Sequence, residues 1–129
     1  MKEKEFWEKI RPFIQKHTKY YERIENRVNQ GTPDVFCLSK NLQPIWIELK
    51  TVKDLLQRPK FQPQQPIWHK IYASKDGNSI ILVNCKDIVY AVKGSDVDSF
   101  FEENFVVENF TNIKNIDSFF AKLFSDLEN

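Results

Sequence analysis

The spacing of apolar side chains separates helical segments of the chain from extended ones. Apolar residues three and four positions apart predict helices, and short runs rich in β-branched residues predict strands. Helices are therefore expected over residues 3–17 and 64–75, from Ser95 onward, and between Ile116 and Leu127. Strands are expected over residues 22–28, from Pro33 onward, and over 44–51, 79–84 and 88–92, with 106–110 either an edge strand or an extended link. The order α–β–β–β–α–β–β–α–α predicts an α/β (α+β) fold, in which helices pack on a mixed sheet.

Proline, glycine and serine mark several boundaries between these elements. Pro12 falls inside the first helical pattern, which predicts a kink or the start of a second helix. Gly31 is expected to end the first strand in a tight turn. Ser95, directly after Gly94, is the expected N-cap of the third helix. Residues 52–63 contain two prolines and little periodicity, which predicts a mobile loop.

Length and composition predict one folded domain over residues 1–129, with a core over about 1–93 and a helical extension over about 95–129. No apolar run approaches the length of a transmembrane helix, so no membrane partner is expected. The first residues mix acids with lysines, which is not the pattern of a secretory signal and favours a cytoplasmic protein. Cys37 and Cys85 are expected to be free, buried thiols, because neither has a second ligand at close spacing.

Charge is unevenly distributed, although the net charge is only +1. Residues 50–76 hold six Lys or Arg against two Asp, whereas residues 96–129 hold two Lys against eight acids. A basic middle and an acidic tail would suit binding of a phosphate backbone on one side of the molecule. Charge alone favours the plainer interpretation, which is chance clustering on a solvated surface.

Two acids and a lysine form the candidate catalytic group. Strand geometry places residues i and i+2 on one face, so Glu48 and Lys50 should point together. The hairpin between the second and third strands should bring Asp34 near Glu48. A divalent cation assists phosphodiester hydrolysis by lowering the pKa of bound water and shielding charge, and Mg²⁺ prefers oxygen ligands. Asp34, Glu48 and the Leu49 main-chain carbonyl are the predicted ligands.

Lys50 is predicted to hold the attacking water or to stabilise the charge that develops on the phosphate. The alternative is an ordinary ion pair between Glu48 and Lys50 on a solvated sheet, because this spacing is common by chance. The context argues against that alternative, since Asp34 follows Gly-x-Pro at a strand start and the pair lies in a strongly apolar β run.

The strings RIENRVNQGTPDVF, PIWIELK and FQPQQPIWHKIYASKDG resemble the PD-(D/E)xK nuclease superfamily. The similarity covers about residues 22–93 and looks closest to small VRR-NUC and Holliday-junction-resolvase-like nucleases, often found in phages. It implies a restriction-endonuclease-like αβββαβ core, Mg²⁺ or Mn²⁺ dependence and DNA cleavage. It also implies a polar role for Gln65 beside Lys50 and an acid upstream of Asp34. Glu25 is the favoured upstream acid, with Glu5 and Glu8 open.

Several further residues could contact DNA. The candidate phosphate contacts are cations that follow the hairpin, namely Lys53, Arg58, Lys60 and Lys70. Trp68 could stack on a base, although a Trp on a helical stripe is more often part of the core. His69 is expected to be solvated, with a phosphate contact as the alternative, and no partner is expected for His17.

The sequence therefore predicts a metal-dependent endonuclease, structure-selective for branched DNA such as a Holliday junction. Two symmetric cuts favour a homodimer, for which the apolar C-terminal helix is the candidate surface. The expected setting is the cytoplasm of a bacterial host cell, with a phage-encoded origin left open. The alternatives are another nuclease on the same fold (a nickase, a flap nuclease or a restriction-like enzyme), a catalytically silent DNA-binding module, and a pure scaffold.

Overall fold

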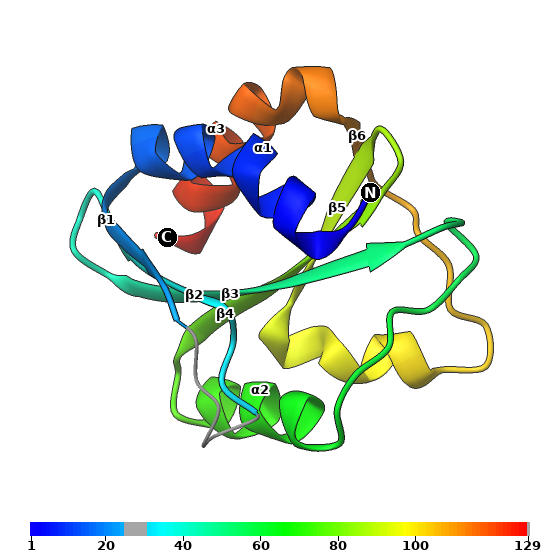
Figure 1. Cartoon of the computed structure of the whole chain (residues 1–129). Helices are drawn as coiled ribbons and strands as arrows, with labels where there is room; N and C mark the ends of the chain where they lie inside the picture. The colour runs from blue at the N-terminus through cyan, green and yellow to red at the C-terminus, as the bar shows by residue number, and fades with distance from the viewer. Residues whose placement is uncertain (25–30, 129) are drawn as a thin grey trace.

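A six-stranded mixed sheet lies between two helical layers (Figure 1). The computed structural model describes residues 1–24 and 31–128. Helices α1 and α3 cover one face of the sheet, and α2 and the 3₁₀ segment η1 cover the other. The elements, in chain order, are α1 (Glu3–His17), β1 (Thr18–Arg23), β2 (Val35–Ser39), β3 (Pro44–Val52), α2 (Gln64–Ser74), β4 (Asn78–Cys85), β5 (Ile88–Lys93), η1 (Gly94–Phe101), β6 (Thr111–Asn112), η2 (Ile113–Asn115) and α3 (Ile116–Leu127).

The strands follow one another across the sheet in sequence order, from β1 at one edge to β6 at the other. Only β3 and β4 are parallel, because α2 connects them by a crossover, whereas every other neighbouring pair is antiparallel. The predicted α/β class is confirmed, and the first six elements have the predicted αβββαβ order.

Strand β3 gives the two faces of the sheet opposite characters. Ile45, Ile47 and Leu49 are buried in the core beneath α1 and α3. Glu48, by the period of two in a strand, faces the α2 side together with its i±2 neighbours. One strand therefore anchors the main core and carries the candidate chemistry.

Helix α1 buries an apolar stripe that includes Phe6, Ile10 and Ile14. It continues as one helix through Pro12, so the second helix that could have begun there is absent. Pro12 is exposed, and water can satisfy the backbone carbonyl that loses its partner.

Two contacts tie the end of α1 to α3. The Lys16 Nζ donates to Asp117 at 2.7 Å, and the His17 Nε2 lies 2.6 Å from the other oxygen of the same carboxylate. The hydrogen bond from Lys16, followed by that from His17, lowers the Asp117 pKa. The expectation that His17 lacks a partner is therefore wrong.

Two predicted boundaries differ from the structure, and the structure decides a third segment for which two possibilities were predicted. Strand β1 begins at Thr18 and ends at Arg23, because it pairs with β2 from Ser39 back to Val35, and residues 25–28 of the predicted strand lie outside the described residues. Ser95 is not an N-cap, because η1 already begins at Gly94 and has no side-chain cap. Residues 106–110 form no strand, which agrees with the link that was the second predicted possibility, and the edge strand is β6.

The apolar face of α3, which was the candidate dimer surface, is used inside the fold. Ile116, Phe120, Phe124 and Leu127 are buried in the core shared with α1. Any dimer would need a different surface. Across the part of the chain that the structure describes, no helix has the length and apolar character needed to cross a membrane.

Both cysteines are free and buried, as predicted. Burial raises the pKa of the Cys37 thiol to about 12. Residues 53–63 contain neither helix nor strand, in agreement with the predicted loop.

Candidate active site

The hairpin of β2 and β3 brings the first predicted acid to the strand that carries the second. Asp34 immediately precedes β2, and its Oδ2 accepts a hydrogen bond of 2.8 Å from the Leu49 main-chain N–H. The N–H and C=O of one strand residue face the same neighbour, so the Leu49 carbonyl also faces the side of Asp34. Asp34 therefore lies against the stretch of β3 that carries Glu48, close enough for Glu48 to influence its pKa.

Lys50 is held by three contacts. Its ammonium donates to the Gln65 Oε1 at 2.8 Å, lies 3.5 Å from the Glu48 Oε2, and is 4.6 Å from the centre of the Phe61 ring. The Gln65 Oε1 also accepts the main-chain N–H of Gln62 at 2.8 Å, which fixes its amide at the start of α2. The contact between Lys50 and Gln65 that the resemblance implied is therefore present, and it leaves Lys50 little freedom.

Glu48 is fully buried, and its two oxygens have different surroundings. The Oε1 lies 3.0 Å from the Nε2 of His69, whose side chain is also fully buried. The Oε2 is buried and has no hydrogen-bond partner among the described residues, and its nearest charge is the Lys50 ammonium. The expected solvated position of His69 is wrong, because α2 turns this residue onto the sheet.

Burial dominates the electrostatics of Asp34. Burial raises its pKa, and the neighbouring Glu48 raises it further, whereas the Leu49 N–H, Arg23 and Lys50 lower it. Glu3, in the first turn of α1, has a raised pKa for the same reasons: burial first, and then Asp34. For both carboxyls the effect of burial outweighs that of the neighbouring cations Arg23 and Lys50.

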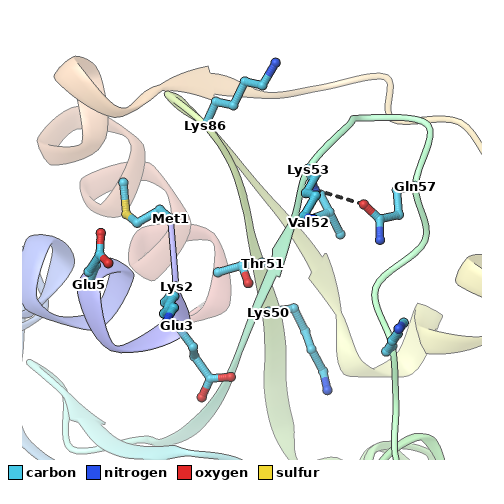
Figure 2. Close-up of a pocket in the computed structure, with 11 residues that line it drawn as sticks. Met1, Lys2, Glu3, Glu5, Lys50, Thr51, Val52, Lys53, Gln57 and Lys86 are labelled. Atoms are coloured by element: carbon cyan, nitrogen blue, oxygen red, sulfur yellow. Dashed lines mark hydrogen bonds between the residues drawn. The ribbon is translucent and has the colours of Figure 1, made fainter.

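Glu3 is a candidate that sequence reasoning missed. Its carboxylate lies 3.5 Å from Arg23, and Figure 2 shows it extending from α1 in the same direction as Lys50 from β3. A signal was available, because Glu3 precedes Trp7 by one helical turn on the buried stripe of α1. Of the acids that were considered instead, Glu5 and Glu8 are exposed. Glu25 lies outside the described residues.

A divalent cation fits the donor set at Asp34, Glu48 and the Leu49 carbonyl. The unbonded, buried Oε2 of Glu48 is the observation that favours it, because a buried carboxylate oxygen normally has a partner. Among the described residues, no three His, Cys, Asp or Glu side chains form a group that could hold a metal ion by themselves. Mg²⁺ keeps several waters and needs only one or two carboxylates, so two acids and a carbonyl are enough.

A basic cavity of about 980 Å³, lined in part by Glu3 and Lys50, opens between the start of α1 and the end of β3 (Figure 2). Its charged lining consists of two acids and five lysines, namely Glu3, Glu5, Lys2, Lys50, Lys53, Lys60 and Lys86. Lys2 and Lys86 were not foreseen, because only the fold brings the N-terminus and the β4–β5 turn next to β3. The excess of lysines suits an anionic substrate.

Of the five residues predicted to contact DNA, Lys53 and Lys60 line this cavity. The remaining three, Arg58, Trp68 and Lys70, contact other parts of the protein instead. The Arg58 guanidinium donates to the main-chain carbonyls of Glu102 and Glu103. Lys70 pairs with Asp98 at 3.3 Å, and Trp68 packs against Trp46 and Tyr72.

Comparison of the sequence with protein-family models gives no match, and comparison with curated proteins gives no significant match.

Proposed function

We propose that this protein is a metal-dependent DNA endonuclease of the PD-(D/E)xK type that hydrolyses phosphodiester bonds. The observation that carries the proposal is the buried Glu48 with an unbonded oxygen, beside a lysine whose ammonium is fixed at the edge of a basic cavity. In an ordinary surface ion pair, the acidic and the basic side chain would both be exposed to solvent. Here the carboxylate is fully buried and only 14% of the Lys50 side chain is exposed.

Asp34, Glu48 and the Leu49 carbonyl would hold the Mg²⁺ or Mn²⁺ ion. When bound, this ion supplies charge neutralisation and a water of lowered pKa. Glu3 lies close enough to influence Asp34 electrostatically and is the upstream acid that the described residues favour. Its carboxylate would orient a water of the ion.

Lys50 would donate a hydrogen bond to the attacking water or to a non-bridging phosphate oxygen as charge develops there. A fixed donor is effective because it needs no reorganisation during the reaction. Gln65 provides that fixation, since it accepts from the Lys50 ammonium and from the turn before α2 at the same time.

The remaining lysines of the cavity would bind the phosphates that flank the cut. Lys2, Lys53, Lys60 and Lys86 all line the cavity beside Lys50. Contacts of this kind are independent of sequence and weaken as salt rises. They would align the backbone so that one phosphate reaches Asp34 and Glu48.

The proposed substrate is branched DNA, and a four-way junction is the preferred class. This part of the proposal is supported by the resemblance of the sequence to small resolvase-like nucleases. A resolvase cuts two symmetric strands, which favours a homodimer with an isologous interface. The proposed setting is the cytoplasm of a bacterial host cell, where such DNA is found.

Cleavage of a set of labelled DNAs tests the proposal. The substrates are a four-way junction, a flap, a plain duplex and a single strand, each with Mg²⁺, Mn²⁺ or EDTA. Glu48→Ala and Lys50→Ala should abolish metal-dependent cutting, and Lys122→Ala, an exposed lysine on α3, is the matched control. Cutting in EDTA, or cutting that survives both substitutions, would refute the mechanism.

The same set separates the alternatives. Equal cutting of duplex and junction would refute the preference for branched DNA, whereas the proposed nuclease activity itself would stand. Tight metal-free binding without any cutting would favour a silent DNA-binding module.

A further inference from the structure

His69, on α2, connects the candidate metal ligand Glu48 on β3 to Ser79 on β4. Its Nε2 lies 3.0 Å from the Glu48 Oε1, and its Nδ1 lies 2.7 Å from the Ser79 Oγ. Both His69 and Ser79 are buried, and Ser79 lies on β4 directly beside Trp46 of β3. The imidazole is therefore held at both nitrogens inside the fold.

The direction of the hydrogen bond to Glu48 follows from the chemistry of the two groups. A carboxylate that binds a metal ion is ionised and can only accept hydrogen bonds. The Nε2 of His69 must therefore carry the hydrogen and donate it to the Oε1. This assignment holds whether the ring is neutral or charged, because Nε2 is a donor in both forms.

The backbone of Gly94 packs so closely against Ser79 and His69 that it leaves no room for a side chain. A Cβ on Gly94 would lie 1.9 Å from the Ser79 Oγ and 3.0 Å from the His69 Nδ1. Gly94 has no positive φ, so the need for glycine here comes from space rather than from backbone conformation. The start of η1 thus closes tightly over the Ser79–His69 hydrogen bond. The ring of Trp68 adds an edge contact at 5.4 Å between centroids.

We propose that His69 is a positioning residue, which fixes the Glu48 carboxylate by its Oε1 so that the Oε2 stays free to bind the metal ion. This inference rests on the proposed function. One Glu48 oxygen has the buried imidazole donor, whereas the other has no hydrogen-bond partner among the described residues and lies 3.5 Å from the Lys50 ammonium, an arrangement that suits a carboxylate binding a cation through one oxygen. Hydrogen-bond partners of ligating carboxylates typically affect metal affinity about 10–100-fold.

Two substitutions of similar polarity separate this role from simple packing. His69→Gln has the reach to place an amide N–H near the position of Nε2 and so keeps the donor to Glu48. His69→Asn is shorter and keeps a group near Nδ1, so it retains the Ser79 contact and loses the Glu48 contact. The readout is Mn²⁺ binding without DNA, measured by calorimetry or electron paramagnetic resonance. Circular dichroism checks folding, and metal-free DNA binding checks the cavity.

We expect H69N to bind Mn²⁺ about 10–100-fold more weakly than the wild type, and H69Q to remain within about threefold. Folding and metal-free DNA binding should be unchanged in both. A folded H69N with wild-type Mn²⁺ affinity would overturn the inference, and so would a folded H69Q as weak as H69N. If H69N does not fold, H69Q decides alone: near-native affinity supports the inference and a tenfold loss overturns it.

Wild type and Glu48→Ala, measured in parallel, separate this inference from the proposed function. If the wild type neither binds Mn²⁺ nor cuts DNA, the nuclease proposal fails and the role of His69 fails with it. If the wild type binds and cuts while H69N does so equally well, only the role of His69 fails.

Discussion

Gly94→Ala is a sharp test of the packing around His69. The added Cβ would meet the Ser79 Oγ at 1.9 Å, where an ordinary contact is 3.4 Å or more. Either Ser79 on the central strand β4 or the start of η1 must move. Either movement costs folding free energy, because Ser79 and Gly94 are both buried and the Ser79 hydroxyl is hydrogen-bonded to His69.

The expected destabilisation combines two costs. Forcing an extra methyl into a well-packed site costs about 1–3 kcal/mol. Displacing the Ser79 hydroxyl from His69 adds about 1 kcal/mol for a lost hydrogen bond. We therefore expect Gly94→Ala to lower the free energy of unfolding by about 2–4 kcal/mol, measured by urea denaturation.

A double-mutant cycle with Ser79→Ala identifies the cause. That substitution removes the oxygen at 1.9 Å, while the Ser79 Cβ at 3.2 Å remains. Gly94→Ala should then cost at least about 1 kcal/mol less in the Ser79→Ala background than in the wild type, because residues in contact are not additive. The exposed neighbour Ser95, changed to Ala, is the control and should stay within about 0.5 kcal/mol. A cost of Gly94→Ala below about 0.5 kcal/mol, or an additive cycle, would refute the described packing.

Three further predictions concern other parts of the molecule. Because burial raises the pKa of Cys37 to about 12, a Cys85→Ser variant should not react with a thiol reagent at neutral pH until it unfolds, and rapid reaction of the native protein would contradict this. Contacts with α1 lower the pKa of the Asp117 carboxyl. Those contacts therefore stabilise the fold at a pH above the unfolded-state pKa of Asp117, and the stabilisation is lost as the pH falls through the lowered, folded-state pKa. Asp117→Asn should therefore lower the Tm at neutral pH and match the wild type at acid pH, and a gap that persists in acid would be inconsistent with this origin. Lys53→Ala and Lys60→Ala should each weaken DNA binding and reduce its salt slope by about 1, whereas Lys122→Ala should not; equal effects of all three would disprove a specific role for the cavity.

The sequence predicted the parts of the site that lie close together along the chain. The period of two in β3 placed Glu48 and Lys50 on one face, and the short hairpin brought Asp34 to the same strand. The span of α2 was likewise predicted, because helix periodicity is a local feature, whereas the place of Gln65 beside Lys50 was implied by the family resemblance.

Residues that meet only through the tertiary fold were harder to predict. From the sequence, His69 is a polar residue on a predicted helix. No local pattern indicates that it contacts Glu48 and Ser79 on the sheet. Glu3 and Lys86 reach the cavity from the N-terminus and from the β4–β5 turn. Pairing between elements so far apart depends on the topology of the whole sheet.

Boundaries failed where competing local signals were nearly equal. Around β1 the sequence of residues 20–28 is compatible with a helix or a strand, and pairing with β2 makes Thr18–Arg23 a strand. At η1 the pair Gly94 and Ser95 suggested a capped α-helix, whereas close packing of Gly94 on Ser79 begins a 3₁₀ segment one residue earlier.

The most direct test of the central claim is metal-dependent cleavage of a labelled four-way junction by wild type and by Glu48→Gln. Gln keeps the shape of the buried side chain and removes the charge that would bind the ion. We predict that the wild type cuts with Mg²⁺ or Mn²⁺ and not with EDTA, and that the variant, still folded, does not cut. Equal cleavage by both proteins, or no cleavage of any DNA by the wild type with either metal, would contradict the account.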